Sequence, residues 1–149
     1  MQLTDHFSLE ELIASEIAAR KGIDNTPSNE IIENLEVLAA GLERVRAVLG
    51  QPIHVNSGYR CLALNTAIGG APDSMHIQGL AADIVCPRFG APLQVCRAIR
   101  DAGLDTDQII HEFGAWTHVA FPAPGKDARH RLLTTASGGG YVDGLNPIA

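Results

Sequence analysis

The chain is poor in basic residues and in cysteines, and it has no long apolar segment. Its 149 residues include 11 lysines and arginines against 17 acidic residues, which gives a formal net charge of −6. Nucleic-acid-binding proteins usually carry a basic face, and proteins that dock on anionic membranes depend on basic residues. We therefore expect no nucleic acid and no membrane surface among the partners.

The three cysteines, Cys61, Cys86 and Cys96, are odd in number and widely spaced, which is unlike a disulfide framework or a structural zinc site. We expect buried, reduced thiols. The N-terminus lacks the basic start and apolar stretch of a signal peptide, and no segment has the length of a transmembrane helix. These features predict a protein synthesised in the cytoplasm, which another agent must release if it acts outside the cell.

Length and an apolar fraction of 46% suit one compact domain, and we assign residues 1–149 to it. Apolar spacing, capping residues and Gly or Pro breaks predict the elements. They are helices at 9–21 and 27–49, a strand at 53–56, a short helix at 61–68, a strand at 80–85, a helix at 92–102, strands at 108–113 and 116–121, and an edge strand at 129–135 before a flexible stretch at 137–140. This order favours an α+β domain with a small, mainly antiparallel sheet and helices packed on one side.

Polar residues interrupt two of the predicted apolar strands. Asp83 lies inside the run 80–85, His76 stands seven residues earlier on a loop, and His118 lies inside the strand 116–121. A buried carboxylate needs a compensating charge, and two histidines with one carboxylate form a usual catalytic zinc set. The residues alone leave open that the histidines are hydrogen-bonded core residues and that Asp83 pairs with an arginine or with backbone N–H groups.

Glu112 is the candidate general base. If Phe113 pairs with Thr117 around a three-residue turn, Glu112 stands directly opposite His118, where a zinc-bound water needs a base. A two-residue turn would instead place His111 opposite His118. A solvent-facing position for Glu112 fits the spacing equally well.

Arg60 follows the turn Ser57-Gly58-Tyr59, which comes directly after the predicted strand 53–56. A fixed guanidinium at this place is suited to bind a substrate carboxylate or to stabilise an oxyanion. A surface arginine is the alternative.

The motif Ser74-x-His76-x-x-Gly79-x-Ala81-x-Asp83 resembles the first metal motif of the zinc D-alanyl-D-alanine carboxypeptidase and endopeptidase family. That family includes bacteriophage endolysins and shares its fold with the hedgehog signalling domain. Three more motifs follow the family's order. They are Leu3-x-x-His6-Phe7-Ser8-x-x-Glu11, similar to the opening of the phage-type branch; Ser57-Gly58-Tyr59-Arg60, similar to the arginine motif; and Trp116-x-His118, similar to the second metal motif. The resemblance spans roughly residues 3–121.

The resemblance implies that His76, Asp83 and His118 bind Zn²⁺ and that Arg60 binds substrate or stabilises the transition state. Many members place the acidic catalyst three residues before the last histidine, where this chain has an alanine, at position 115. Glu112 remains the best candidate, in keeping with the phage-type branch.

The resemblance implies a zinc metallopeptidase that hydrolyses peptidoglycan stem peptides, as a D,D-carboxypeptidase or an endopeptidase. We expect the chain to be a monomer. It would act on the cell wall after release or as part of a phage particle. The alternative is a non-hydrolytic cell-wall-binding or phage tail assembly module with the same fold. Ala115, at the position where many members have their acid, keeps that alternative open.

Overall fold

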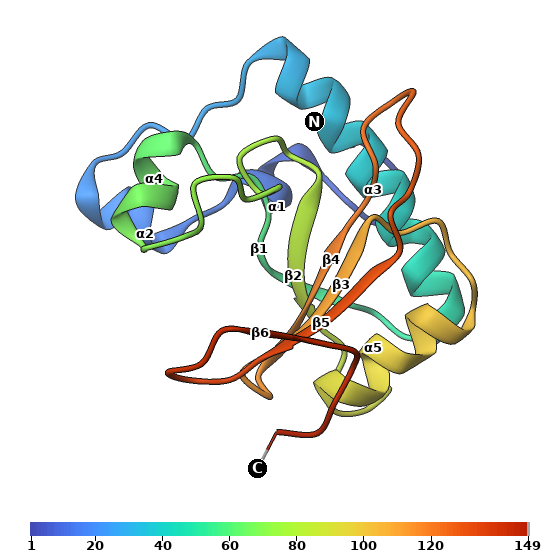
Figure 1. Ribbon diagram of the computed structural model, residues 1–149. Coiled ribbons are helices and arrows are strands. Elements are labelled where there is room, and N and C mark those ends of the chain that lie inside the picture. The colour runs from blue at the N-terminus through green and yellow to red at the C-terminus, as the bar shows by residue number, and fades with distance from the viewer. Residues whose placement is uncertain (149) are drawn as a thin grey trace.

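The computed structural model describes residues 1–148 (Figure 1). Its helices and strands follow one another as α1 (Leu9–Ile13), α2 (Glu16–Lys21), α3 (Asn29–Leu49), β1 (His54–Ser57), α4 (Leu62–Ala67), β2 (Ala81–Val85), α5 (Pro92–Asp101), β3 (Gln108–Glu112), β4 (Trp116–Ala120), β5 (Arg131–Thr135) and β6 (Tyr141–Asp143). Within this part of the chain, no helix is both long and apolar enough to cross a membrane.

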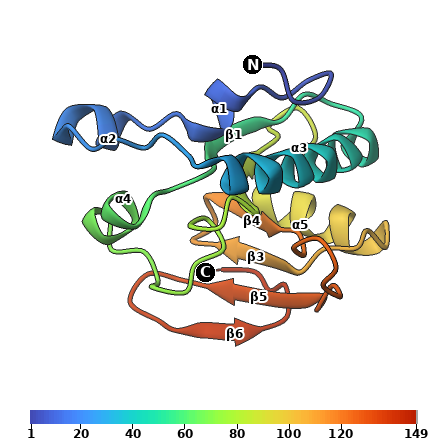
Figure 2. The ribbon, with the colours of Figure 1, turned by 90° about the horizontal axis from the view of Figure 1, so that it is seen from above.

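The strands form one sheet in the order β1-β2-β4-β3-β5-β6. Every neighbouring pair is antiparallel except β3 and β5, which run parallel. The long helices α3 and α5 lie together on one face of the sheet, and the short helices α1, α2 and α4 gather near β1 (Figures 1 and 2). The predicted α+β fold with a mainly antiparallel sheet is confirmed.

The core lies between the sheet and the helices α3 and α5. The apolar stripe of α3 is fully buried, with Leu35, Leu38 and Leu42 all at 0% exposure. Gly41 lets this helix approach closely, because a Cβ there would lie 2.5 Å from the ring of Phe121. Alternation along β2, β3 and β4 sends one set of side chains into this core and the other set to the opposite face. The opposite face carries the polar residues considered below.

The N-terminal segment forms two helices where the sequence predicted one. The expected cap at Ser8 is present, since its side chain accepts from the backbone N–H of Glu11. The chain becomes extended at Ala14, and Ser15 then caps a second helix by accepting from the N–H of Ala18. A serine in this position offers the backbone an alternative to a continuous helix. Likewise, α3 starts at Asn29, because Ser28 supplies its cap, two residues after the predicted start.

The C-terminal part of the sheet also differs from the prediction. The strand β5 is not an edge strand, because it pairs with β3 on one side and with β6 on the other. The strand β6 forms the edge and follows the glycines at 138–140. All three cysteines are free thiols, two of them buried, while Cys61 is only half-buried and caps α4.

The β3–β4 hairpin has a three-residue loop, but the predicted register is wrong. Glu112 pairs with Trp116, and Ile110, not Glu112 or His111, stands opposite His118. The loop therefore lies one residue earlier on each strand. Phe113 leaves the ladder with a positive φ of 59° and donates its N–H to the carbonyl of Thr135 on β5. The partner of His118 is thus two residues earlier on β3 than predicted. Because side chains alternate with a period of two, Glu112 and His118 still share a face.

Candidate metal centre

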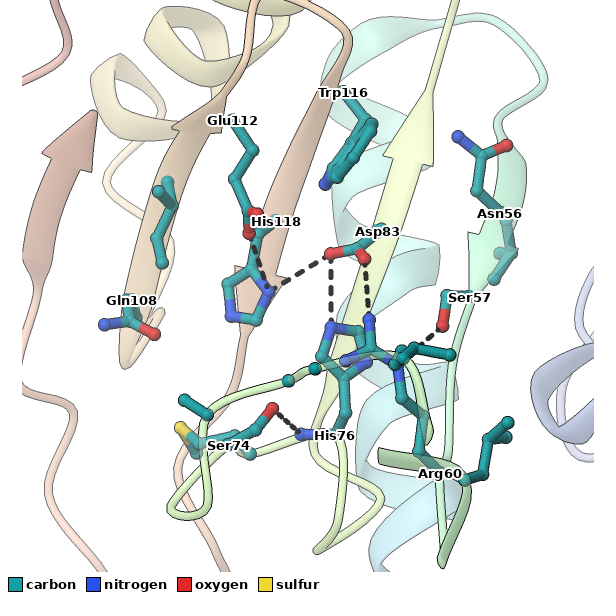
Figure 3. Close-up of a pocket in the computed structure, with 18 of the residues that line it drawn as sticks. Asn56, Ser57, Arg60, Ser74, His76, Asp83, Gln108, Glu112, Trp116 and His118 are labelled. Atoms are coloured by element: carbon teal, nitrogen blue, oxygen red, sulfur yellow. Dashed lines mark hydrogen bonds and ion pairs between the residues drawn. The ribbon is translucent and has the colours of Figure 1, made fainter. Parts of the chain in front are cut away.

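Three predicted ligands come together on the face of the sheet away from α3 and α5. Asp83 of β2 and His118 of β4 are direct cross-strand partners. His76 reaches them from the loop that precedes β2 (Figure 3). All three are buried, with exposed fractions of 2% for His76 and 5% for each of the others.

The ligating atoms are arranged as a metal requires. His76 Nε2 and His118 Nδ1 each lie 3.1 Å from Asp83 Oδ1, and one ligand atom from each residue falls within 4.8 Å of the others. Ligands bonded to tetrahedral zinc at about 2.0–2.2 Å are roughly 3.3 Å apart. Small adjustments of these side chains would therefore hold one ion between them.

The tautomer of His76 shows that this cluster suits a cation. His76 Nδ1 lies 2.7 Å from the carbonyl oxygen of Gly58, which only accepts, so Nδ1 carries the proton. In a neutral ring, Nε2 then points a lone pair at the carboxylate of Asp83, which is also an acceptor. A cation or an added proton must lie between the two atoms. Orientation of a histidine by a backbone carbonyl is the usual outer-shell arrangement of a metal ligand.

The charge of Asp83 is held by its neighbours. Burial alone would raise its pKa, but the two histidines outweigh burial and hold the pKa of Asp83 well below its usual range. Asp83 is therefore an anion at neutral pH, as a metal ligand must be.

Arg60 is part of this cluster and not a surface residue, since its side chain is only 12% exposed. Its Nη2 donates to Asp83 Oδ2 at 3.1 Å, its Nε to Ser57 Oγ at 3.1 Å and its Nη1 to Asn65 Oδ1 at 3.3 Å. One carboxylate oxygen of Asp83 thus faces the histidines and the other faces Arg60. Asn65, which is 2% exposed, belongs to none of the motifs that predicted the site.

The turn before Arg60 has little freedom. A Cβ on Gly58 would lie 2.2 Å from the carbonyl oxygen of Leu12, and Tyr59 donates its N–H to the same oxygen. The backbone N–H of Arg60 donates to the carbonyl of His76. Contacts with α1 and with the loop that carries His76 therefore hold the backbone of the turn from which the Arg60 side chain projects.

Glu112 lies beside the three ligands. Its side chain is 14% exposed, and its Oε1 is 3.5 Å from His118 Nδ1. Burial, together with the negative charge of Asp83, raises the pKa of Glu112 to about 7. A carboxyl group with such a pKa is suited to both accept and release a proton near neutral pH.

His111 is not in the site. It projects to the opposite face of β3, where its Nδ1 donates to the carbonyl of Asn146 at 2.9 Å. His6 binds Glu43 near the N-terminus. Neither histidine is available as a further ligand.

A comparison with known families matches this chain to a family described as Peptidase M15, over residues 5–120. The chain belongs to the peptidase M15 family. The matched segment includes every predicted site residue. The match confirms the resemblance to the zinc D-alanyl-D-alanine carboxypeptidase and endopeptidase family. A search of curated proteins found no match.

In this M15 peptidase the cluster faces a cleft of about 930 Å³. Arg60, Glu112 and Trp116 line it together with the three ligands. The cleft also includes Arg131 of β5 and Tyr141 of β6, which lie beyond the segment matched by the family. The sequence pointed to neither residue as part of the site. Arg131 lies in a strand predicted as an edge, and the glycines before β6 carry no periodic pattern.

Proposed function

We propose that the protein is a zinc metallopeptidase that hydrolyses peptide bonds in peptidoglycan stem peptides. The observation that carries this proposal is the convergence of His76, Asp83 and His118 beside a buried carboxylate with a raised pKa. Membership in a peptidase family supports hydrolysis of a peptide bond. The stem-peptide substrate rests on the resemblance of the four motifs.

His76 Nε2, Asp83 Oδ1 and His118 Nδ1 would hold the ion. Zinc bound there supplies Lewis acidity toward the scissile carbonyl and lowers the pKa of water to around 7. Glu112 accepts the proton of the attacking water and passes it to the leaving amine. Burial of the Glu112 carboxyl and the negative charge of Asp83 raise its pKa, which favours uptake of a proton.

Arg60 acts first on the metal ligands, because its Nη2 holds the second oxygen of Asp83. Arg60 also lines the cleft. It therefore remains our candidate for contact with a substrate carboxylate or with the oxyanion of the scissile bond.

The direct test is incubation of zinc-loaded protein with purified peptidoglycan, followed by mass spectrometry of the products. Release of a terminal D-alanine would identify a carboxypeptidase, and larger fragments would identify an endopeptidase. Zinc-free protein is the control. Retention on peptidoglycan with no product would overturn the proposal and support the wall-binding or assembly module.

We further propose that the protein acts as a monomer on the cell wall, after release from the cell or within a phage particle. Size-exclusion chromatography with light scattering tests the first part, and a dimer would contradict it. Lysis or thinning of cell walls on external addition tests the second.

A further inference from the structure

The only tryptophan of the chain, Trp116, stands next to the proposed general base. It is the cross-strand partner of Glu112 and lies two residues before His118, so all three side chains share one face of the sheet. Its ring packs edge-on against Phe113, with centroids 5.4 Å apart and planes at 64°. Figure 3 shows the indole nitrogen pointing toward the carboxylates of Glu112 and Asp83.

The indole N–H of Trp116 is buried and has no hydrogen-bond partner among residues 1–148. A buried donor without an acceptor lowers stability, and native proteins rarely leave one unpaired. The unpaired indole N–H therefore indicates that the site has a second state, in which an acceptor lies within hydrogen-bond distance of it.

Glu112 is the acceptor with free capacity. Both oxygens of Asp83 are already engaged, Oδ1 with the two histidines and Oδ2 with Arg60. The carboxylate of Glu112 has only the 3.5 Å contact with His118 Nδ1. Burial dominates the raised pKa of Glu112. The indole N–H of Trp116 lies near enough to this carboxylate to favour its charged form, but it falls short of hydrogen-bond geometry.

Metal binding would change the partners of Glu112. A metal ion on His118 uses the lone pair of Nδ1, so this atom no longer offers Glu112 a proton. The N–H of Trp116, on the neighbouring strand, then becomes the free donor beside the carboxylate.

We infer that Trp116 is a positioning residue whose indole N–H donates to Glu112 when metal occupies the His76–Asp83–His118 site. The hydrogen bond orients the carboxylate toward the cleft. This inference rests on the proposed function.

The first test reads the indole directly. Protein labelled with ¹⁵N-tryptophan has one indole N–H signal, because there is one tryptophan. Zinc titration should move this signal downfield in the wild type, with the shift largely lost in Glu112→Ala, whose zinc content is checked by elemental analysis. Equal shifts in both proteins, or no shift at full zinc occupancy, would overturn the inference alone. Failure to bind zinc would overturn the metal site and this inference with it.

The second test removes the donor without changing the shape of the ring. Tryptophan replacement by β-(3-benzothienyl)alanine alters one position and exchanges the N–H for sulfur. We expect kcat on peptidoglycan to fall about 10- to 100-fold, the usual size of an outer-shell effect, with KM and zinc content unchanged. Replacement by 7-azatryptophan keeps the N–H and should rescue most of the loss. An unchanged kcat in the sulfur analogue would overturn the inference, whereas a wild type without activity would count against the proposed function.

Discussion

The two faces of the central sheet bury side chains to a similar degree by different means. On the face covered by α3 and α5, Ala82, Ile84 and Val119 are at 0% exposure among apolar neighbours. On the other face, Asp83 and His118 are at 5%, although one is charged and the other polar. Burial on the first face is favourable by itself, whereas burial on the second requires compensating charges.

The difference separates stability from function. The apolar side chains of the helix-covered face stabilise the fold, so substitutions there should act mainly on the free energy of unfolding. The polar face is a cluster of two histidines, two carboxylates and one guanidinium, three of whose side chains could hold a metal ion. Substitutions on this face should act mainly on metal binding and turnover.

The largest expected effect is on the polar face. Glu112→Gln is nearly isosteric and can still accept a hydrogen bond, but its amide does not take up a proton near neutral pH. We expect turnover to fall about 100- to 10,000-fold with fold and zinc content retained, measured on the same peptidoglycan substrate. An active Glu112→Gln protein would refute the role of Glu112 as the base.

His111→Ala is the matched control for Glu112, because His111 is the next residue on β3 but projects to the opposite face. Its turnover per folded molecule should match the wild type. Loss of turnover without loss of folded protein would contradict the observed register.

The next largest effect is expected from a substitution in the core under the helix-covered face. Leu42→Ala removes a side chain at 0% exposure from the core and should lower the free energy of unfolding by about 2–5 kcal/mol, measured by urea denaturation. Val48→Ala on the same helix is the control, since Val48 is 36% exposed and should change stability by less than about 0.5 kcal/mol. Zinc affinity of the folded Leu42→Ala protein should be unchanged, and a large change would mean that the two faces are not independent.

The motifs were enough to predict that His76, Asp83 and His118 come together, because those residues lie within or next to strands whose alternation is local. Asp83 and His118 interrupt apolar runs, and a polar residue in such a run must meet a partner on its own face. The α+β class followed from the same local patterns.

The remaining features depend on contacts distant in sequence. The hairpin register is set partly by the bond between Phe113 and Thr135, 22 residues later, which no local pattern contains. The pairing of Arg60 with Asp83 joins residues 23 apart. The strand β6 has three exposed residues after a run of glycines, and neither feature predicts a strand.

Zinc itself should stabilise the protein through the polar face. We expect about one zinc per chain, and free zinc at 100 times its dissociation constant should add about 2.7 kcal/mol to the free energy of unfolding. The reason is that the ligands converge only in the folded chain. Calorimetry with and without a chelator measures the effect, which Asp83→Ala should abolish. A wild type that takes up no zinc on reconstitution would refute the metal site.

The smallest expected effect concerns Arg60, whose guanidinium binds Asp83 on the polar face. Arg60→Lys keeps the positive charge opposite Asp83 but loses the planar fork that binds Ser57, Asn65 and Asp83 at once. An ammonium group on a flexible stem would hold Asp83 Oδ2 less firmly, so the ligand would be less well oriented. We expect zinc affinity and turnover each to fall about 10- to 100-fold, as is usual for the outer shell of a metal site.

The control for Arg60 is Arg100→Lys, because Arg100 pairs with the exposed Asp101 at the end of α5, away from the cleft. Zinc affinity from competition with a chelating dye and turnover on peptidoglycan distinguish two roles of Arg60. A fall in both quantities supports its action through Asp83. A fall in turnover alone, with zinc affinity intact, would mean that Arg60 acts on the substrate instead, and the bond to Asp83 would then be incidental to the metal. If neither quantity changed, Arg60 would be a structural residue, and a charge of any geometry would suffice to balance Asp83 on the polar face of the sheet.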